Sequence, residues 1–356
     1  MPEVYLAKGT RDYLPEQMHR RLAAIDLVRT VFTRFGFEPL ETPAFERIET
    51  LTGKYGEEGQ QLLFKILKRG EGAERGEVDQ ALRYDLTVPL ARVVAMHPDI
   101  RLPFKRWQIA PVWRADRPAK GRFREFVQCD VDIVGSDSSL AEAECLAVAA
   151  AALTELGFPD FVIRLNDRRI LAAIAEKIGA SGREAPLLVA VDKLDKIGQA
   201  GVSKELVGRG FTPDQVVALW QVLDVPEGND AALVHLGHTL GAGEAIGSLR
   251  EILAFSDALG IPPGRIVIDP TLARGLDYYT GAVFEAVIPE SGMGSVAGGG
   301  RYDGLVGMFA GRRIPAVGIA LGLERLLTLL EDRAAKSGPA TAAPTLVTIW
   351  DEERRP

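Results

Sequence analysis

The chain has 356 residues, 47% of them hydrophobic and 26% charged, which is enough for two or three domains with ordinary apolar cores. Its net charge of −7 argues against a protein that coats nucleic acid with a uniformly basic surface. The longest apolar stretch, residues 145–153, is far shorter than the roughly 20 residues of a membrane span, and the chain does not open with a basic segment followed by an apolar one. We therefore expect a cytoplasmic protein without a membrane segment. Cys129 and Cys145 do not have the spacing of metal ligands, so we expect no metal site.

A long amphipathic helix is predicted near the start of the chain. Residues 16–35 carry apolar side chains at helical spacing, and Gly36 follows where such a helix would end. The next segment, residues 37–45, contains Pro39 and Pro43, which lack the amide hydrogen that an inner strand donates. We therefore expect an extended segment at a sheet edge, at a bulge or at an interface.

Two antiparallel strands are predicted next, over residues 104–112 and 126–134, with an arginine-rich loop between them. Eight basic residues and a single acid lie between Arg101 and Arg124. Such a run is often a solvated face, but apolar strand positions interrupt it here. We expect some of these guanidinium groups to line a partly enclosed site, in which a bound anion neutralises their positive charge.

The rest of the pattern predicts an α+β fold whose core is made from two pieces. A helix over residues 139–156 and a strand over 161–165 come before a helical stretch. Strand signals then return at residues 266–268, 282–287, 295–297 and 316–320. We predict a core of residues 1–166 and 260–333, a helical insertion at 167–259, and a linker with one further strand at 334–356.

The most specific motif is RGLDYYTG, which places a guanidinium, a carboxylate and two phenols between Arg274 and Gly281. A tight turn before an aromatic strand would explain its glycines and one tyrosine, but not the whole set. Arginine offers a planar, permanent charge that suits a carboxylate and a phosphate oxygen together. The motif therefore predicts a ligand site.

Two glycine-containing motifs lie in the same half of the chain. AGGGRYDGL, residues 297–305, holds three consecutive glycines, each of which costs a strand roughly 0.5 to 1 kcal/mol relative to alanine. This motif predicts either close approach of a ligand to the backbone or a plain hairpin loop. AVGIALGLERLL, residues 316–327, predicts a strand of small residues that turns at Gly322 into a helix with Glu324 and Arg325 in its first turn.

Two stretches of the first half carry polar groups on apolar segments. In LRYDLTVPLAR, Asp85 and Thr87 are two residues apart and share one side of the segment if it is extended. They would then hold a substrate ammonium group, or alternatively cap a turn. In EFVQCDVDIVG, Gln128, Asp130 and Asp132 alternate onto one strand face, which either meets water or lines a pocket.

Together these motifs resemble the histidyl-tRNA synthetase family of class II aminoacyl-tRNA synthetases. GTRDYLP at residues 9–15 is similar to the N-terminal signature of that family, and FGFEPLETPAF at 35–45 to its motif 1. The hairpin around Arg114 resembles motif 2, ALGLERLL at 320–327 resembles motif 3, and RGLDYYTG and AGGGRYDG resemble the two histidine-specific motifs. The resemblance covers residues 1–333 and implies the class II catalytic core, a mixed, mainly antiparallel sheet flanked by helices, with the first strand of a truncated anticodon-binding domain after residue 334.

The resemblance also implies a reaction and a site. Histidine and ATP would form histidyl-adenylate, and the histidyl group would pass to tRNA(His), with Mg²⁺ accompanying ATP and no tightly bound cofactor. Arg114 and Arg274 would be the catalytic pair at the α-phosphate, and Asp132 and Tyr279 would contact the imidazole. The implied histidine-binding residues are Asp85, Thr87, Arg114, Gln128, Asp132, Arg274, Tyr278 and Tyr279, and the implied ATP-binding residues are Arg114, Arg122, Glu125 and Arg325. A homodimer is implied as well, because motif 1 builds the subunit interface in this class.

Two other functions fit parts of the sequence. The histidine-sensing regulatory subunit of ATP phosphoribosyltransferase has the same fold and lacks the anticodon-binding domain, but that family usually loses the ATP-handling arginines that are present here. A pseudo-synthetase that serves as a tRNA-binding or signalling module is the third hypothesis. His235 and His238, three apart on a predicted helix, would be half of a metal site with no third ligand nearby.

Overall fold

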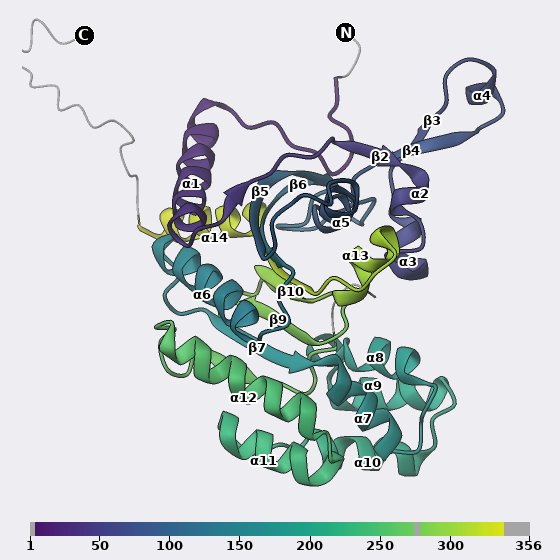
Figure 1. The fold of residues 1–356 in the computed structure, drawn as a ribbon, viewed down its shortest axis with the longest axis vertical. Coiled ribbons are helices and arrows are strands. Elements are labelled where there is room, and N and C mark those ends of the chain that lie inside the picture. Colours follow the sequence, from purple (N-terminus) through teal and green to yellow (C-terminus); the bar gives the residue numbers. More distant parts are fainter. Residues whose placement is uncertain (1–3, 274–277, 338–356) are drawn as a thin grey trace, which may run out of the picture.

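The computed structural model describes residues 4–273 and 278–337, and its course is shown in Figure 1. Within these ranges an eight-stranded sheet forms the centre of the molecule. In spatial order its strands are β1 (Glu38–Pro39), β5 (Phe104–Trp113), β6 (Glu125–Val134), β11 (Ala316–Gly322), β10 (Ala297–Arg301), β9 (Ala282–Val287), β7 (Val162–Asp167) and β8 (Ile266–Ile268). The pairs β1–β5 and β7–β8 are parallel and the others antiparallel, so the predicted mixed, mainly antiparallel α+β fold is confirmed.

Long helices pack beside this sheet. The predicted first helix is present as α1 (Pro15–Arg34), and the alanine-rich helix as α6 (Leu140–Glu155). α14 (Leu323–Ser337) follows β11 directly and lies against β6 and α1. α5 (Thr87–Met96) and α13 (Asp303–Ala310) pack on each other, and their buried side chains share a cluster with Val134 and Ala316. Pro39 lies in β1 at the sheet edge, as its missing amide predicts.

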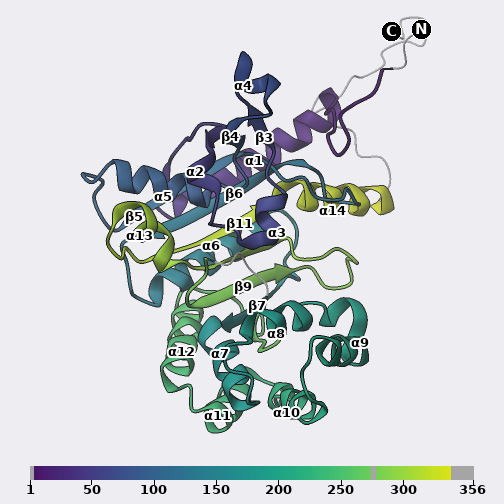
Figure 2. The same cartoon turned by 90° about the vertical axis from the view of Figure 1, so that its right-hand side faces the viewer.

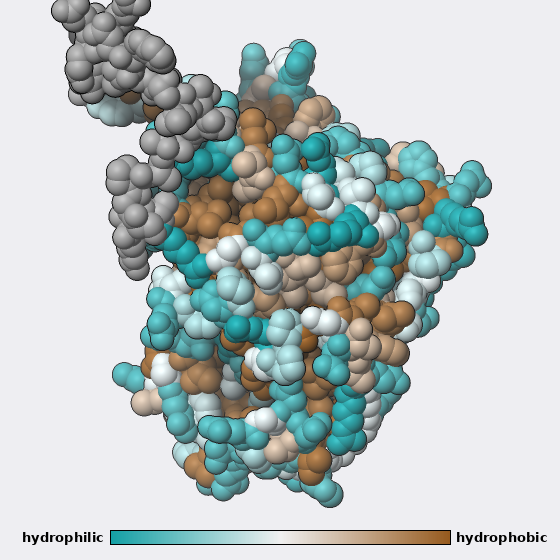
Figure 3. All heavy atoms as spheres, turned by 90° about the vertical axis from the view of Figure 1, so that its left-hand side faces the viewer, coloured by the Kyte–Doolittle hydropathy of each residue, from teal (hydrophilic) through white to brown (hydrophobic). Residues whose placement is uncertain are grey.

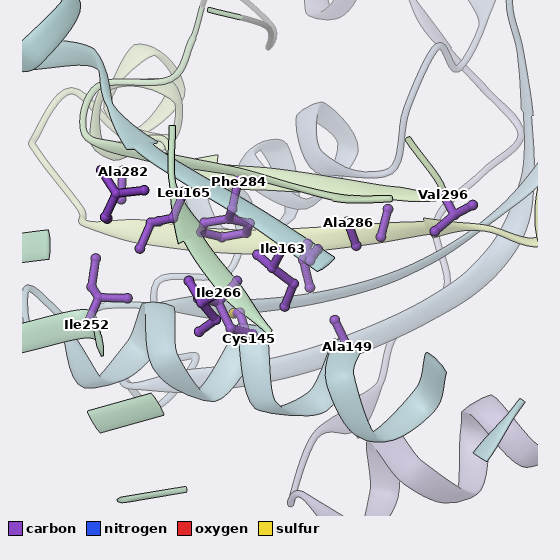
Figure 4. Close-up of a cluster of buried hydrophobic side chains, with 14 of the residues drawn as sticks. Cys145, Ala149, Ile163, Leu165, Ile252, Ile266, Ala282, Phe284, Ala286 and Val296 are labelled. Atoms are coloured by element: carbon purple, nitrogen blue, oxygen red, sulfur yellow. The ribbon is translucent and has the colours of Figure 1, made fainter. Parts of the chain in front are cut away.

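Small side chains let α6 approach one face of the sheet closely. Figure 4 shows Cys145 and Ala149 of this helix beside Ile163 of β7 and Phe284 of β9, with little space between helix and strands. The face of β6 that points the same way carries Cys129, Val131 and Ile133, all buried in this cluster. Because side chains alternate along a strand, the opposite face of β6 receives Gln128, Asp130 and Asp132.

A second sheet of three strands is formed by residues 45–82, together with three short helices. Its order is β2 (Phe45–Arg47), β4 (Val78–Leu82) and β3 (Lys65–Leu67). The short helices around it are α2 (Ile48–Leu51), α3 (Gly56–Gln61) and α4 (Glu71–Glu74). The hairpin of β3 and β4 that carries α4 projects from the body of the molecule (Figure 1).

The stretch from 167 to 259 is helical, as predicted. Its helices are α7 (Arg168–Lys177), α8 (Glu184–Val191), α9 (Leu194–Gly208), α10 (Pro213–Leu223), α11 (Asn229–Leu240) and α12 (Gly243–Ala258). They gather on the side of the sheet that ends in β7 and β8 (Figure 2). Their buried side chains join those of α6 and β7 in one cluster. Whether this stretch forms a separate insertion domain stays a prediction.

Three predicted segments differ from the structure or lie outside it. The strand expected at 295–297 is instead β10, Ala297–Arg301, and it includes the three glycines. α14 continues to Ser337, through the first residues of the predicted linker. The strand expected after residue 344 lies outside the described residues, as does Arg274.

No helix within the described ranges is both long and apolar enough to cross a membrane. Figure 3 shows one face of the molecule, on which hydrophobic and hydrophilic residues are interleaved.

Candidate active site

A cavity of about 460 Å³ lies over the polar face of β6 and extends across β11 and β10. This volume is within the range of small-molecule sites. Segments that are far apart in the sequence meet here: the turn before α5, the β5–β6 loop, the middle of β9 with the tyrosines before it, and the first turn of α14. Nine predicted site residues line the cavity: Asp85, Thr87, Arg114, Arg122, Gln128, Asp132, Tyr278, Tyr279 and Arg325.

Two predicted site residues are not placed in this cavity. Glu125 begins β6 with an exposed side chain and is not among the lining residues. Arg274, half of the predicted catalytic pair, lies outside the described residues, so its position relative to Arg114 stays a prediction.

Asp85 lies at one wall of the cavity, and its carboxylate accepts three hydrogen bonds. The Val88 amide and the Tyr55 hydroxyl donate to Oδ1 at 3.0 and 3.2 Å, and the Tyr278 hydroxyl donates to Oδ2 at 3.2 Å. Burial raises the pKa of Asp85, while the Val88 hydrogen bond and the Arg114 charge oppose that shift. Of the two alternatives predicted for this segment, the structure has the capping turn: Thr87 begins α5, and Asp85 accepts from the Val88 amide of its first turn. The same carboxylate therefore caps the helix and lines the cavity.

Asp132 lies at the other end of the polar row on β6 and is held on both oxygens. The Nη2 atom of Arg106 is 2.7 Å from Oδ2, and the Tyr302 hydroxyl donates to Oδ1. Arg106 and Asp132 face each other across β5 and β6, and both are almost completely buried. Burial raises the pKa of Asp132, and the Arg106 guanidinium and the Tyr302 hydrogen bond lower it. The carboxylate is thus fixed in position at the cavity wall.

Aromatic side chains enclose this part of the cavity. The rings of Tyr278 and Tyr279 are 5.0 Å apart, and those of Tyr278 and Tyr302 are 5.9 Å apart, with edge-on geometry in both pairs. Burial raises the pKa of all three phenols, so each keeps its proton at neutral pH and remains a hydrogen-bond donor.

Arg114 lies where β5 ends and is oriented by neutral groups. Its Nε donates to the Tyr84 carbonyl and its Nη2 to the Gln128 side chain, both at 3.0 Å. The guanidinium lies 4.3 Å from the centre of the Tyr84 ring. Because these contacts fix its direction without neutralising it, the guanidinium suits an anion in the cavity.

Two more arginines line the same side of the cavity. Arg122, in the β5–β6 loop, is 2.8 Å from Oδ1 of Asp116, and Arg325, in the first turn of α14, donates to the Ser295 carbonyl. The cavity is therefore polarised: its arginines lie towards the β5–β6 loop, where Asp116 and Glu324 are paired with arginines, and further carboxylates lie along β6 and before α5.

Glu324 connects the N-terminal segment to the cavity. One carboxylate oxygen accepts from Arg21 at 2.7 Å and from the Tyr13 hydroxyl at 3.4 Å, and the other accepts from the Val127 amide at 2.8 Å. The Arg124 amide also donates to the Gly9 carbonyl at 2.8 Å. The predicted GTRDYLP signature thus lies against both the β5–β6 hairpin and the start of α14.

The glycines of β10 and β11 are required mainly by neighbouring protein atoms. A Cβ on Gly299 would lie 2.6 Å from the Phe284 ring, and one on Gly300 would lie 2.9 Å from the Tyr279 ring. A Cβ on Gly318 would lie 2.0 Å from Oδ1 of Asp132. Of the three consecutive glycines, Gly298 is the one that both lines the cavity and has room for a side chain. Close approach of a ligand to the backbone therefore explains at most one of the three glycines, and contacts with protein atoms explain the other two.

Several lining or supporting residues were not assigned a role from the sequence: Tyr55, Tyr84, Arg106, Asp130, Tyr302 and Glu324. Arg106 stands within a predicted strand, between Lys105 and Trp107, and it faces Asp132 across the predicted hairpin. The contact of Tyr302 with Asp132 was not readable from the pattern. In the described part of the chain, no cluster of three or more potential metal ligands is found.

The family model and two of the most similar relatives point to the same family. A family model described as histidyl-tRNA synthetase matches residues 9–326. A histidine–tRNA ligase of Cytophaga hutchinsonii is 45% identical over 99% of this chain and 82% of its own length, and one of Gloeobacter violaceus is 44% identical over 98% and 79%. The crystal structure of histidyl-tRNA synthetase from a Nostoc species superposes with a TM-score of 0.81 at 33% identity, covering 94% of this chain and 76% of that one.

Proposed function

Because the chain belongs to the histidyl-tRNA synthetase family, we propose that it activates L-histidine with ATP and transfers the histidyl group to tRNA(His). The observation that carries the proposal is the polarised cavity. An amino acid presents an ammonium group and a carboxylate a few bonds apart, and ATP adds phosphates. A site with carboxylates on one side and arginines on the other accommodates both substrates.

In the first step, a carboxylate oxygen of histidine attacks the α-phosphorus of ATP. A bond forms between that oxygen and phosphorus, the bond to the bridging oxygen breaks, and pyrophosphate leaves. Arg114, which Tyr84 and Gln128 hold in place, is proposed to bind the histidine carboxylate and an α-phosphate oxygen. A fixed donor aimed at charge that develops during the reaction contributes roughly 2.7 to 4 kcal/mol. Arg274 is proposed from the family resemblance as the second such group.

The imidazole is proposed to lie between Asp132 and Tyr279, with Tyr278 at the wall and Asp85, Thr87 and Gln128 nearer the α-carbon. Arg106 and Tyr302 support this role, because they keep the Asp132 carboxylate in one orientation. A site built to hydrogen-bond polar ring atoms rejects apolar amino acids by roughly 10⁴ to 10⁵, since its own buried groups would lose their partners.

ATP is proposed to bind towards the β5–β6 loop, where Arg114, Arg122 and Arg325 line the cavity. Glu125 remains a proposal for the same nucleotide, although its side chain is exposed in this structure. Mg²⁺ is proposed to enter with the phosphates, which suits an ion that keeps waters and binds few protein carboxylates. Its contribution when bound would be to neutralise phosphate charge.

The second step, the assembly and the location belong to the same proposal. The 3′-hydroxyl of the terminal adenosine of tRNA(His) would attack the carbonyl carbon of the adenylate, and AMP would leave. We propose a cytoplasmic homodimer, with residues 35–45 at the interface. We also propose that residues 167–259 form an insertion domain within a catalytic core of 1–166 and 260–333.

The test is histidine-dependent exchange of labelled pyrophosphate into ATP. We expect exchange by the unmodified chain, and a loss of about 10²- to 10³-fold in Arg114→Ala, because a positioned donor to the reacting phosphate is removed. Arg101→Ala is the matched control: this arginine is exposed, belongs to the same basic run, and does not line the cavity. Arg274→Ala tests the role drawn from the resemblance.

The regulatory-subunit alternative predicts a different result. A chain that binds histidine, measured by calorimetry, but supports no exchange would contradict the ligase function and favour the sensor. Equal exchange by the parent chain and by Arg114→Ala would contradict the role given to the cavity.

A further inference from the structure

Asp130 lies in the middle of the polar row on β6, between Gln128 and Asp132, and lines the cavity. Its side chain is almost completely buried, with 2% of the residue exposed. The hydrogen bond that the described part of the chain provides is a long one, from Gln128 Nε2 to Oδ1 at 3.3 Å. Asp85 receives three donors and Asp132 is held by Arg106 and Tyr302. Of these three carboxylates, Asp130 is therefore the one that has neither an ion pair nor several hydrogen-bond donors within the described part of the chain.

Among the described residues, the carboxylates of Asp85, Asp130 and Asp132 outnumber the nearby guanidinium groups of Arg106 and Arg114. Besides Glu324, which pairs with Arg21, three buried carboxylates line the cavity, those of Asp85, Asp130 and Asp132. Arg106 is the buried guanidinium beside them, and the partly buried Arg114 also lines the cavity. Arg106 pairs with Asp132, and its Nε and Nη1 atoms have no acceptor within the described residues. An ionised carboxylate buried without a partner is costly, so it either takes up a proton or meets a cation.

We propose that Asp130 binds the α-ammonium group of the amino acid substrate directly, and that binding of the substrate displaces a proton from Asp130. The inference rests on the proposed function, because it takes histidine as the ligand. It adds a second acidic contact to the one predicted for Asp85, and it makes substrate affinity depend on pH.

The position of Asp130 along β6 selects the ammonium group rather than the ring. Alternate residues of a strand are about 6.5 to 7 Å apart, so Asp130 is one such step from Asp132 and one from Gln128. Gln128 contacts Arg114, the proposed carboxylate ligand, and Asp132 lies at the proposed imidazole end. In histidine the ammonium group and the carboxylate are attached to the same α-carbon. With the carboxylate at Arg114 and the ring at Asp132, the ammonium group lies between them, opposite Asp130.

The groups around Asp130 explain why its proton is exchangeable. Burial raises its pKa well above the ordinary value, and the charges of Asp132 and Asp85 act in the same direction. Arg106 and Arg114 lower it. Tyr279 also lines the cavity, and burial raises the pKa of its phenol, which therefore stays neutral. Cys129, which precedes Asp130 in β6, faces the opposite side of the strand, and burial also raises the pKa of its thiol. A substrate ammonium group adds a positive charge that lowers the Asp130 pKa and releases the proton.

The first test compares histidine with imidazole propanoate, which has the same ring and carboxylate but no amino group. We expect Asp130→Asn to bind histidine about tenfold to a hundredfold more weakly than the unmodified chain, the usual range for a lost charged hydrogen bond. The same variant is expected to bind imidazole propanoate equally well, within about twofold. An equal loss for both ligands would overturn the proposal, because Asp130 would then act on the ring or on the fold.

The second test measures protons. Calorimetric titration with histidine in buffers of different ionisation enthalpy reports the number released on binding, and the titration of the ligand itself is common to all variants. We expect the unmodified chain to release more protons than Asp130→Asn, while Asp257→Asn, an exposed carboxylate on α12, matches the unmodified chain. Equal proton release by all three would overturn the proposal.

Two further comparisons keep the result decisive. If Asp130→Asn does not fold, the unmodified chain alone provides the test, since histidine must release a proton that imidazole propanoate does not. A chain that binds neither ligand contradicts the proposed function itself. A chain that binds histidine and supports pyrophosphate exchange, with no effect at Asp130, contradicts only this inference.

Discussion

At the scale of single residues, the cavity depends on a glycine that leaves room for one of its carboxylates. Gly318 of β11 faces Asp132 across the strand pair. A Cβ there would lie 2.0 Å from the Asp132 carboxylate and 2.9 Å from the Val131 carbonyl. Because Asp132 is tied to Arg106 and Tyr302, it has little freedom to move aside.

We expect Gly318→Ala to displace Asp132 and raise the KM for histidine at least tenfold, with a smaller effect on the KM for ATP. Overpacking of this kind also costs about 1 to 3 kcal/mol of stability. Pyrophosphate exchange at varied histidine and ATP, with urea unfolding, measures both effects. Gly247→Ala on α12, with open space around it, serves as the control and is expected to stabilise slightly. An unchanged KM for histidine would contradict the role of Asp132.

Asp130 also has a consequence for the stability of the unliganded protein. Its pKa is raised in the folded state, so the folded chain retains a proton that the unfolded chain loses. Stability therefore falls as pH rises from the ordinary aspartate value through the raised one. We expect Asp130→Asn to have a higher Tm than the unmodified chain at pH 8, with the difference shrinking as the pH is lowered.

The measurement is thermal unfolding of both chains without ligand over a series of pH values. In domains of 150–250 residues, about 1 kcal/mol moves Tm by roughly 2–4 °C, so a shift of a few degrees is resolvable. A lower Tm for Asp130→Asn at pH 8 would show that the ionised carboxylate is stabilising, contrary to the charge count.

At the scale of elements, α1 and α14 are joined by a buried ion pair that also reaches the β5–β6 hairpin. Arg21 and Glu324 have 7% and 5% of their surface exposed, and Glu324 also accepts from the Val127 amide. Removing one partner of a buried pair leaves the other charge unpaired, at a cost of about 3 to 5 kcal/mol.

We expect Arg21→Met to lower the free energy of unfolding by about 3 to 5 kcal/mol. We also expect it to raise the KM for ATP, because Glu324 would lose its partner and the next residue of α14 is Arg325, a proposed ATP ligand. The neighbouring Arg20 provides the control, since its pair with Glu16 is exposed and such pairs contribute about 0 to 1 kcal/mol. Urea unfolding and exchange kinetics check both variants. Similar losses in Arg20→Met and Arg21→Met would contradict the special role of the buried pair.

Elements were easier to predict from this sequence than the contacts between them. The alternation around Val131 and the spacing of the alanines in α6 sufficed for β6 and α6, because local burial sets those periods. Arg106 faces Asp132 within the predicted hairpin of β5 and β6. Tyr302 is 170 positions from Asp132 along the chain, so its hydrogen bond to that carboxylate was not predictable. For Asp85 the sequence left an extended segment and a capping turn both open, because nothing local distinguished them.

At the scale of the whole molecule, the proposed homodimer can be tested at residues 35–45. Phe45 of β2 is half exposed, as expected of an apolar side chain that a second copy would cover. We expect Phe45→Asp to convert a dimer into a monomer at micromolar concentration, measured by light scattering, because burying an unpaired charge opposes association. Phe255→Asp, on α12 and also exposed, should leave the dimer intact. A monomeric unmodified chain would contradict the proposal.

The pairing of β6 with β11 also bears on how the protein is made. β6 ends at Val134 and β11 begins at Ala316, so the floor of the cavity waits for about 180 further residues to be synthesised. At roughly 5–20 residues per second, the hairpin of β5 and β6 spends about 10 to 40 s on the ribosome with one backbone edge unsatisfied. A nascent chain with such an unpaired edge is exposed to aggregation and suits binding by a chaperone, and the cavity is among the last parts to assemble.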